Sequence, residues 1–352
     1  MKNPYVGFPS RQFWKHAVVN KSFSELAGLY EPKFSIPAGA KIGAAGSCFA
    51  QHVRKYFNQQ GLDVYDVEPG PKILLEDALA DVLNLADYGY GVYSARFGNI
   101  YTVRQLLQLA REALRGEVRS EEEIVWEKDG RFYDALRPGV FKHGFESREE
   151  LLEQRKHHLL KVRQLFRNSD FFIFTFGLTE AWTNVKTGLV YPTAPGVVAG
   201  VYEPEAYSFL NLDCSDVYAD FCKFRRIVKS VNPKIKFIIT VSPVALAATA
   251  SDDHVIVATT YSKSALRTAA GMLKREFDDV DYFPSYDLLT SPPVRYAFHQ
   301  PDLREIHPQG VNVVMQYFAA AHPDFFAGTK KRKGPVVDDE IFCEEALLGG
   351  QS

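Results

Sequence analysis

The sequence predicts an α/β protein in which helices cover both faces of a five-stranded parallel sheet. Five short apolar runs, typical of buried strands, are separated by longer segments in which apolar residues recur at helical spacing. Strands that alternate with helices in this way usually lie parallel, because each helix carries the chain back to the start of the next strand. The predicted strands are Lys41–Ala45, Asp63–Val67, Asp170–Phe176, Lys236–Ser242 and Asp279–Tyr286.

Signals at helix starts support several of the helical segments. Ser147 with Glu150, and Thr102 with Gln105, have the spacing of a capping box, in which each side chain satisfies a backbone N–H group at the helix start. Pro308 suits a first helical turn, because its φ angle is fixed and it lacks an N–H group. The predicted helices are Val103–Leu114, Ser147–Phe166, Ser215–Val231, Ser262–Phe277 and Val311–Ala320.

Three segments do not fit this alternation. Residues 68–146 are too long for a simple crossover, and we expect a helical insertion that packs over the carboxyl edge of the sheet. Residues 186–211 are rich in Gly, Pro and Tyr, which predicts a long functional loop. The end of the chain carries blocks of like charge, typical of a solvated end. We therefore expect one domain over residues 1–326 and a mobile tail over residues 327–352.

The composition limits the class of protein. The chain has 352 residues, of which 46% are hydrophobic and 24% charged, enough to bury a large core. Its 41 basic and 43 acidic residues nearly cancel, so a small-molecule or carbohydrate substrate is a better expectation than nucleic acid. No segment resembles a signal peptide or a membrane span, which predicts a cytoplasmic protein.

The cysteines predict neither a metal site nor a disulfide. Cys48, Cys214, Cys222 and Cys343 show no CxxC pairing, and no metal or cofactor is expected. Cys214 and Cys222 lie in a predicted helix and are expected to fill core, whereas Cys343 in the tail is expected to be a free thiol. The oligomeric state stays open.

Polar motifs follow three of the predicted strands. Ligands of open parallel sheets bind beyond the carboxyl ends of the strands, so these positions are the first places to look for a site. Gly-Ser-Cys-Phe-Ala follows the first strand at residues 46–50, and Thr-Phe-Gly-Leu-Thr-Glu-Ala-Trp spans the end of the third at residues 175–182. Asp-Leu-Arg-Glu-Ile-His-Pro-Gln-Gly lies beyond the fifth at residues 302–310.

These three blocks resemble the GSCFA domain family, which is named for the pentapeptide at residues 46–50, and through it the SGNH/GDSL hydrolase superfamily. The resemblance covers most of the chain, from Asn3 to about Phe326. It implies a flavodoxin-like, SGNH hydrolase-like three-layer fold with an ester-hydrolase site.

The resemblance also assigns roles to residues of the first two blocks. Cys48 stands where the superfamily has its nucleophilic serine, and Ser47 stands where it has an aspartate. Thr179 replaces the oxyanion-hole asparagine, and its hydroxyl can still donate a hydrogen bond. The implied oxyanion hole consists of the Cys48 backbone N–H, Gly177 and Thr179.

The last block implies a catalytic histidine without its usual aspartate. His307 would be the general base, but Arg304 occupies the position of the aspartate that normally orients it. Asp302 and Glu305 are the candidate replacements, and we expect His307 Nδ1 to donate to this stretch or to a backbone carbonyl. A thiol depends less on such a partner, since its thiolate forms near neutral pH at a helix N-terminus. We therefore predict that Cys48 is reactive and that the Ser47 hydroxyl bonds nearby backbone.

Simpler interpretations exist for each residue. Ser47 and Cys48 could serve only tight packing at a strand-to-helix turn, and His307 could only cap or pack. Glu180 and Trp182 either bind substrate or lie on the packed face of a helix that begins after Gly177. The predicted function is an acyl-ester hydrolase or O-acyltransferase on a carbohydrate-type substrate. The alternative is an inactive relative that binds a carbohydrate or a nucleotide.

Overall fold

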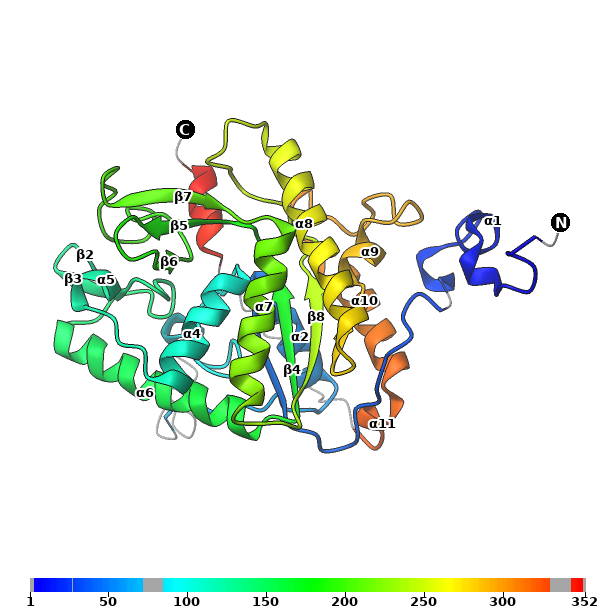
Figure 1. Cartoon of the computed structure of the whole chain (residues 1–352), viewed down its shortest axis with the longest axis horizontal. Helices are drawn as coiled ribbons and strands as arrows, with labels where there is room; N and C mark the ends of the chain where they lie inside the picture. The colour runs from blue at the N-terminus through cyan, green and yellow to red at the C-terminus, as the bar shows by residue number, and fades with distance from the viewer. Residues whose placement is uncertain (1–2, 27, 72–84, 330–342, 351–352) are drawn as a thin grey trace.

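The computed structural model describes residues 3–26, 28–71, 85–329 and 343–350. Its central sheet is parallel and has four strands in the order β1-β4-β8-β9, with helices on both faces (Figure 1). This confirms the α/β class and the parallel sheet. The strands are β1 (Ile42–Gly46), β4 (Phe171–Phe176), β8 (Lys236–Val241) and β9 (Val280–Tyr282).

The predicted strand at residues 63–67 is wrong. Tyr65 N–H donates to the carbonyl of Ile42 at 2.9 Å, so the segment does touch the outer edge of β1. The next position along this edge is taken by Ser94, whose N–H donates to Ala44 O at 3.3 Å and whose hydroxyl accepts from Ala44 N–H at 2.8 Å. Because a side chain accepts the bond that a ladder needs from the backbone, no fifth strand forms.

The sheet residues alternate between two apolar cores. Phe172, Phe174 and Phe176 of β4 point into one core, and Phe171 and Ile173 point into the other. The first core is covered by α4 (Val103–Arg115), α6 (Arg148–Asn168), α7 (Cys214–Lys229) and α8 (Val255–Glu276). The second is covered by α2 (Cys48–Gln59), α9 (Ser285–Leu289) and α10 (Pro308–Ala321), followed by α11 (Pro323–Phe326). Figure 1 shows α7 in front of β4 and β8, with α2 behind them.

A small antiparallel sheet replaces the predicted loop at residues 186–211. Its strands are β5 (Glu180–Asn184), β6 (Val190–Tyr191) and β7 (Tyr207–Asn211), in the order β6-β5-β7. The segment after Gly177 is thus a strand and not the helix that we considered. Trp182 of β5 lies opposite Phe209 of β7, and their rings pack edge to face, with centroids 6.0 Å apart. Such cross-strand aromatic pairs favour a sheet.

The described part of the insertion lies mainly beside the sheet and not above it. It contains η3 (Leu85–Tyr88), α4, α5 (Glu121–Ile124) and the hairpin of β2 (Val125–Lys128) and β3 (Arg131–Asp134). Helix α4 packs against α6 and α7. The insertion reaches the carboxyl ends of β1 and β4 at Ile100 and Tyr101, through Ile100 N–H to Gly46 O at 2.9 Å and Gly177 N–H to Tyr101 O at 3.0 Å.

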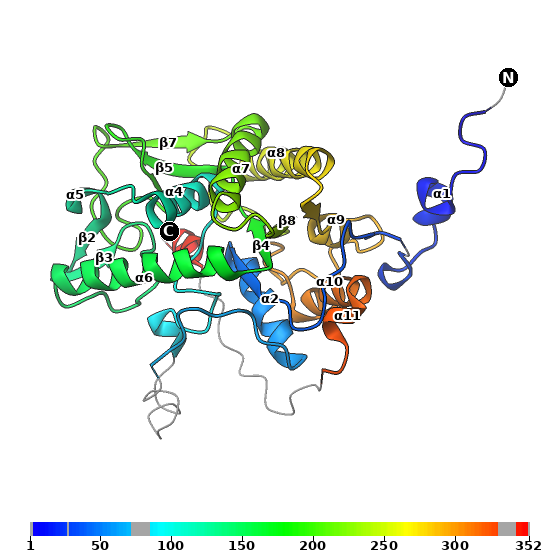
Figure 2. The ribbon, with the colours of Figure 1, turned by 60° about the horizontal axis from the view of Figure 1, so that its bottom comes forward.

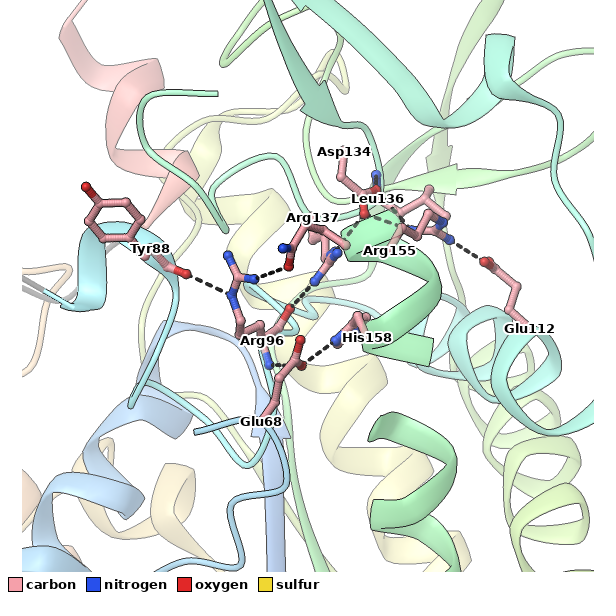
Figure 3. Close-up of polar contacts among 10 residues, drawn as sticks. Glu68, Tyr88, Arg96, Glu112, Asp134, Leu136, Arg137, Arg155 and His158 are labelled. Carbon is pink, nitrogen blue, oxygen red and sulfur yellow. Dashed lines mark hydrogen bonds and ion pairs between the residues drawn. The ribbon is translucent and has the colours of Figure 1, made fainter. Parts of the chain in front are cut away.

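Buried charges join the insertion to α6 (Figure 3). Nη1 of Arg155 lies 3.0 Å from each carboxylate oxygen of Asp134, and its Nη2 donates to Glu112 of α4. Arg137 donates to Asp134 at 2.6 Å. The network continues from Arg137 to Arg96, Glu68 and His158. Because these buried charges are paired, the network can hold the insertion in one position.

The two ends of the chain differ in position. The N-terminal elements η1 (Ser10–Gln12), α1 (Trp14–Ala17) and η2 (Phe23–Glu25) lie at one side of the molecule in both views (Figures 1 and 2). The C-terminal η4 (Glu344–Gly350) begins in the protein interior, since residues 343–345 are buried, whereas Leu347 and Leu348 are exposed. For these three residues the expectation of a solvated tail is wrong, and residues 330–342 lie outside the described part. No helix of the described ranges is long and apolar enough to cross a membrane.

Candidate active site

The turn from β1 to α2 presents Ser47 and Cys48 at the carboxyl edge of the sheet. Gly46 has φ +148°, and a Cβ atom there would lie 2.8 Å from backbone and side-chain atoms of Thr175 in β4. Only glycine accommodates both the angle and the contact. Ser47 is the N-cap of α2 and Cys48 its first residue, and both side chains are buried.

Gly177 makes room for Ser47 and does not offer an oxyanion donor in this structure. A Cβ atom on Gly177 would lie 2.8 Å from Ser47 Cβ. The N–H groups of Gly177 and Leu178 both donate to the Tyr101 carbonyl at 3.0 Å. The expectation of a free Gly177 N–H is therefore not met, because the Tyr101 carbonyl already accepts from it.

Three hydroxyls near this turn are buried without a hydrogen-bond partner among the described residues: Ser47 Oγ, Thr175 Oγ1 and Thr179 Oγ1. The Thr179 N–H donates to Ser262 Oγ at 3.1 Å, which leaves the Thr179 hydroxyl as an available donor. The Ser47 hydroxyl does not bond nearby backbone, so that prediction is wrong. Its orientation is set by packing against Gly177.

His307 caps a helix in this structure. It is the N-cap of α10, and its Nδ1 accepts from Gln309 N–H at 3.2 Å. The prediction that Nδ1 donates to a carboxylate or a carbonyl is therefore wrong, since a ring nitrogen that accepts carries no proton. No hydrogen bond within the described part of the chain joins His307 to Cys48.

The two candidate partners of His307 are engaged within their own loop. Asp302 Oδ1 accepts from the N–H groups of Arg304 and Glu305 at 3.0 and 3.1 Å. Glu305 pairs with the Arg304 guanidinium at 3.5 Å. Neither carboxylate orients the histidine. The Nη2 atom of Arg304 faces Cys343 and Glu345 of the C-terminal segment.

A second thiol, that of Cys343, lies in the same buried cluster as Cys48. Cys343, from the C-terminal segment, accepts a hydrogen bond from the Cys48 thiol, and both side chains belong to one buried cluster. The Tyr101 hydroxyl lies 3.5 Å from Cys343 Sγ, and Arg304 Nη2 lies 3.8 Å from it. The hydrogen bond from Cys48, the Tyr101 hydroxyl and the Arg304 charge outweigh burial and lower the pKa of Cys343 to about 5. The hydrogen bond to Cys343 and burial raise the pKa of Cys48 well above its usual value.

The two glutamates that follow Cys343 bind residues around this cluster. Glu344 accepts from the Tyr101 hydroxyl at 2.7 Å and also from the Asn99 amide. Glu345 pairs with Arg304 at 3.0 Å. Burial, which outweighs these partners, raises the pKa of both carboxyls to about 7.

Lys263 supplies a further buried charge beneath the turn. This residue of α8 donates from Nζ to the Gly177 carbonyl at 2.7 Å, and only 2% of it is exposed. Burial lowers the pKa of its ammonium to about 8. The predicted helix Ser262–Phe277 puts Lys263 in a first turn, whereas α8 begins at Val255 and Lys263 lies in its interior. The charged surroundings of Cys48 are thus Arg304, Lys263 and Glu345.

Glu180 and Trp182 make contacts away from the thiols. Glu180 Oε1 accepts from the Thr249 hydroxyl at 2.7 Å, and burial raises the pKa of its carboxyl. Trp182 packs against the rings of Tyr202 and Phe209. None of these contacts involves Cys48 or His307, so substrate binding by the two residues stays a prediction. Within the described ranges, no group of three His, Cys, Asp or Glu side chains could hold a metal ion.

The model of the GSCFA family matches residues 41–318, which include all three motif blocks. The chain belongs to the GSCFA family. No curated protein matches the chain.

Two solved structures are distantly similar to part of this GSCFA-family chain. One is a carbohydrate esterase family 2 enzyme with a carbohydrate-binding domain, from Corynascus thermopiles (Myceliophthora fergusii), at 14% identity and a TM-score of 0.23. That similarity covers 44% of this chain and 37% of the esterase, so the chain spans little more than a third of that protein. The other is 14% identical over 46% of this chain and 68% of its own, with a TM-score of 0.26. Similarity at this level supports no inference about function.

Proposed function

We propose that this GSCFA-family chain is an acyl-ester hydrolase or O-acyltransferase, related to the SGNH/GDSL enzymes, that acts on a carbohydrate-type substrate through Cys48. The observation that carries the proposal is the position of the Cys48 thiol. Cys48 is the first residue of α2, at the carboxyl edge of a parallel sheet, in a buried apolar cluster where the charges of Glu345 and Arg304 reach it. Ligands of such sheets bind at this edge.

The proposed reaction begins with attack of the Cys48 thiolate on the carbonyl carbon of an ester. The new C–S bond forms while the carbonyl electron pair moves to oxygen, and collapse of this intermediate expels the alkoxide and leaves a thioester. The alkoxide takes the proton that the general base removed from the thiol. Water or the hydroxyl of an acceptor then cleaves the thioester, and this choice separates a hydrolase from an acyltransferase.

Two donors support stabilisation of the oxyanion. The backbone N–H of Cys48 lies in the first turn of α2, where N–H groups have no carbonyl partner within the helix. The Thr179 hydroxyl is buried and has no acceptor among the described residues. A buried donor of this kind typically contributes a factor of about 10²–10³ to kcat.

His307 is the proposed general base, and its capping bond sets a condition on that role. With Nδ1 accepting from Gln309, the neutral ring carries its proton on Nε2. The ring must release the Gln309 N–H before it can accept the proton of Cys48. Residues 343–345 must also leave Cys48 before an ester can reach it, because only 6% of Cys48 is exposed.

A binding protein for a carbohydrate or a nucleotide is the second candidate. The observation that favours it is the capping role of His307, which leaves Cys48 without a hydrogen-bonded base in this structure. The two candidates differ in one measurable property, which is covalent turnover.

Acid-quenched mass spectrometry with p-nitrophenyl acetate and an acetylated monosaccharide tests the proposal. We expect an acyl group on the peptide that contains Cys48, and its loss in Cys48→Ala but not in Ser47→Ala. Ligand binding without any acyl-enzyme or turnover would favour the binding protein.

The chain offers a matched control for His307. His254 is the N-cap of α8, and its Nδ1 accepts from Ile256 N–H at the same 3.2 Å. Either His→Ala change removes a cap and costs about 0.5–2 kcal/mol of stability. A catalytic His307 predicts an additional loss of about 10²–10⁴ in kcat for His307→Ala alone. Equal turnover in both variants would show that His307 only caps α10 and takes no part in catalysis.

A further inference from the structure

The C-terminal segment is held near the candidate nucleophile by contacts of the two residues that follow Cys343. Glu344 bonds to Tyr101 and Asn99, which belong to the insertion, and Glu345 pairs with Arg304 of the loop before α10. Glu344 is fully buried and Glu345 is 8% exposed. Two buried carboxylates directly after Cys343 fix the segment and so hold its thiol in a defined place.

The two thiols belong to one buried cluster, and the Cys343 sulfur has several donors near it. Cys343 Sγ accepts from the Cys48 thiol, with the Tyr101 hydroxyl at 3.5 Å and the Arg304 guanidinium at 3.8 Å. Hydrogen bonds and a cation around one sulfur favour its thiolate, which is the reactive form of cysteine. Cys48 keeps its proton and lies next to it.

We propose that Cys48 and Cys343 form a reversible disulfide when the protein meets a peroxide. The proposed acyl chemistry does not use Cys343. The sulfur–sulfur bond would tie the C-terminal segment covalently to the turn between β1 and α2.

The chemistry balances in two steps. The Cys343 thiolate attacks one oxygen of hydrogen peroxide, the O–O bond breaks, and Cys343 becomes a sulfenic acid while the departing hydroxide takes a proton to become water. The Cys48 sulfur then attacks the sulfenic sulfur, and the second oxygen leaves as water with the Cys48 proton. Two thiols are oxidised and one peroxide is reduced to two waters. A dithiol such as dithiothreitol reverses the bond by thiol–disulfide exchange.

The disulfide removes the thiol that the proposed ester chemistry needs. That consequence rests on the proposed function, whereas the bond itself depends only on the contact between the two thiols. The site would thus be inactive under peroxide stress and would recover on reduction.

The experiment uses the full chain, reduced and then freed of reductant. It is treated with hydrogen peroxide, denatured in excess iodoacetamide and digested without reductant. We expect the Cys48–Cys343 cross-linked peptide as the main oxidised product and its disappearance after dithiothreitol. Cys214 and Cys222, about 12 Å apart along α7, are the internal control and should remain alkylated.

Three variants sharpen the test. Cys343→Ser should leave Cys48 alkylated or singly oxidised, with no cross-link. Arg304→Gln should form the disulfide more slowly than Arg304→Lys, because glutamine carries no charge to favour the Cys343 thiolate.

Several results would overturn the proposal. One is full alkylation of both Cys48 and Cys343 after a peroxide dose that oxidises free dithiothreitol. Another is sulfinic acid on Cys48 with Cys343 still reduced. Disulfide formation without ester turnover leaves this proposal standing and removes the hydrolase, while turnover without a disulfide does the reverse.

Discussion

Replacing Arg155 by methionine tests how much the buried network stabilises the fold. Arg155 donates to both oxygens of Asp134 and to Glu112, and all three side chains are buried. Methionine fills much of the same volume without a charge, so the cost comes mainly from the two carboxylates left behind. Asp134 keeps Arg137, but Glu112 keeps only Arg119, at 3.6 Å.

The expected loss is about 3–5 kcal/mol of unfolding free energy, the usual cost of removing one partner of a buried ion pair. The loss should also depend on pH. Burial raises the pKa of Glu112 even with Arg155 present, and removing Arg155 raises it further. An acid with a raised folded pKa is best tolerated at low pH and loses stability as pH rises through that pKa. The variant should therefore lie closer to wild type at pH 5 than at pH 8.

Urea unfolding at the two pH values measures both effects, with Arg148→Met as the control. Arg148 lies on the same helix and pairs with Glu127 at 3.2 Å, but both side chains are about half exposed. Its replacement should cost less than about 1 kcal/mol at either pH. Equal losses of unfolding free energy in the two variants would refute the argument that buried charge is the cause. So would an Arg155→Met loss that is the same at both pH values.

Two further predictions concern the turn at Cys48 and the C-terminal segment. Gly46→Ala should cost about 2–5 kcal/mol in urea unfolding, because it combines backbone strain with a 2.8 Å contact to Thr175. Gly91→Ala, where φ is also positive but nothing lies within 4 Å of the added Cβ, should cost clearly less. Similar costs for the two variants would contradict the argument that the contact with Thr175 destabilises Gly46→Ala. Burial raises the pKa of Glu344 and Glu345 to about 7, whereas the pKa of Cys343 is lowered to about 5, so the carboxyls and the thiol change the docking of residues 343–350 in opposite directions as pH rises. In Cys343→Ser the thiol is absent, and the docking should weaken as pH rises through 7. Hydrogen exchange of this segment in that variant, corrected for intrinsic rates, should show less protection at pH 8 than at pH 6, and constant protection would contradict the prediction.

Local sequence signals predicted the helices better than the strands. The capping box at Thr102 is complete, and at Ser147 the side chain accepts from the Glu150 N–H. Helices α4 and α6 begin directly after these two residues. The strand expected at residues 63–67 failed because its pairing depends on Ser94, a distant residue whose hydroxyl takes the place of a backbone acceptor. The sheet of β5, β6 and β7 was missed because the pairing of Trp182 with Phe209 is a long-range property.

The motif at residues 46–50 predicted where the candidate nucleophile lies, and its surroundings were not predictable in the same way. Acidic residues near a chain end are usually solvated, so Glu344 and Glu345 gave no sign of burial. The burial of Lys263 was not expected, because the predicted helix start at Ser262 put this residue in a first turn and not inside α8. The one available signal was Arg304, a cation in the position where the proposed SGNH pattern has an aspartate, since a buried guanidinium requires an anionic partner.

The departures of this chain from the SGNH pattern form one connected arrangement. With Arg304 in place of the aspartate, the loop before α10 presents a cation that cannot orient His307, and the histidine turns to the Gln309 N–H. The same cation pairs with Glu345 and approaches the sulfur of Cys343. A serine nucleophile would gain nothing from a neighbouring thiolate, whereas Cys48 can form a covalent bond with it. The exchange of aspartate for Arg304, the thiol at Cys48 and the docked Cys343 therefore fit a site whose nucleophile is controlled by oxidation as well as by access.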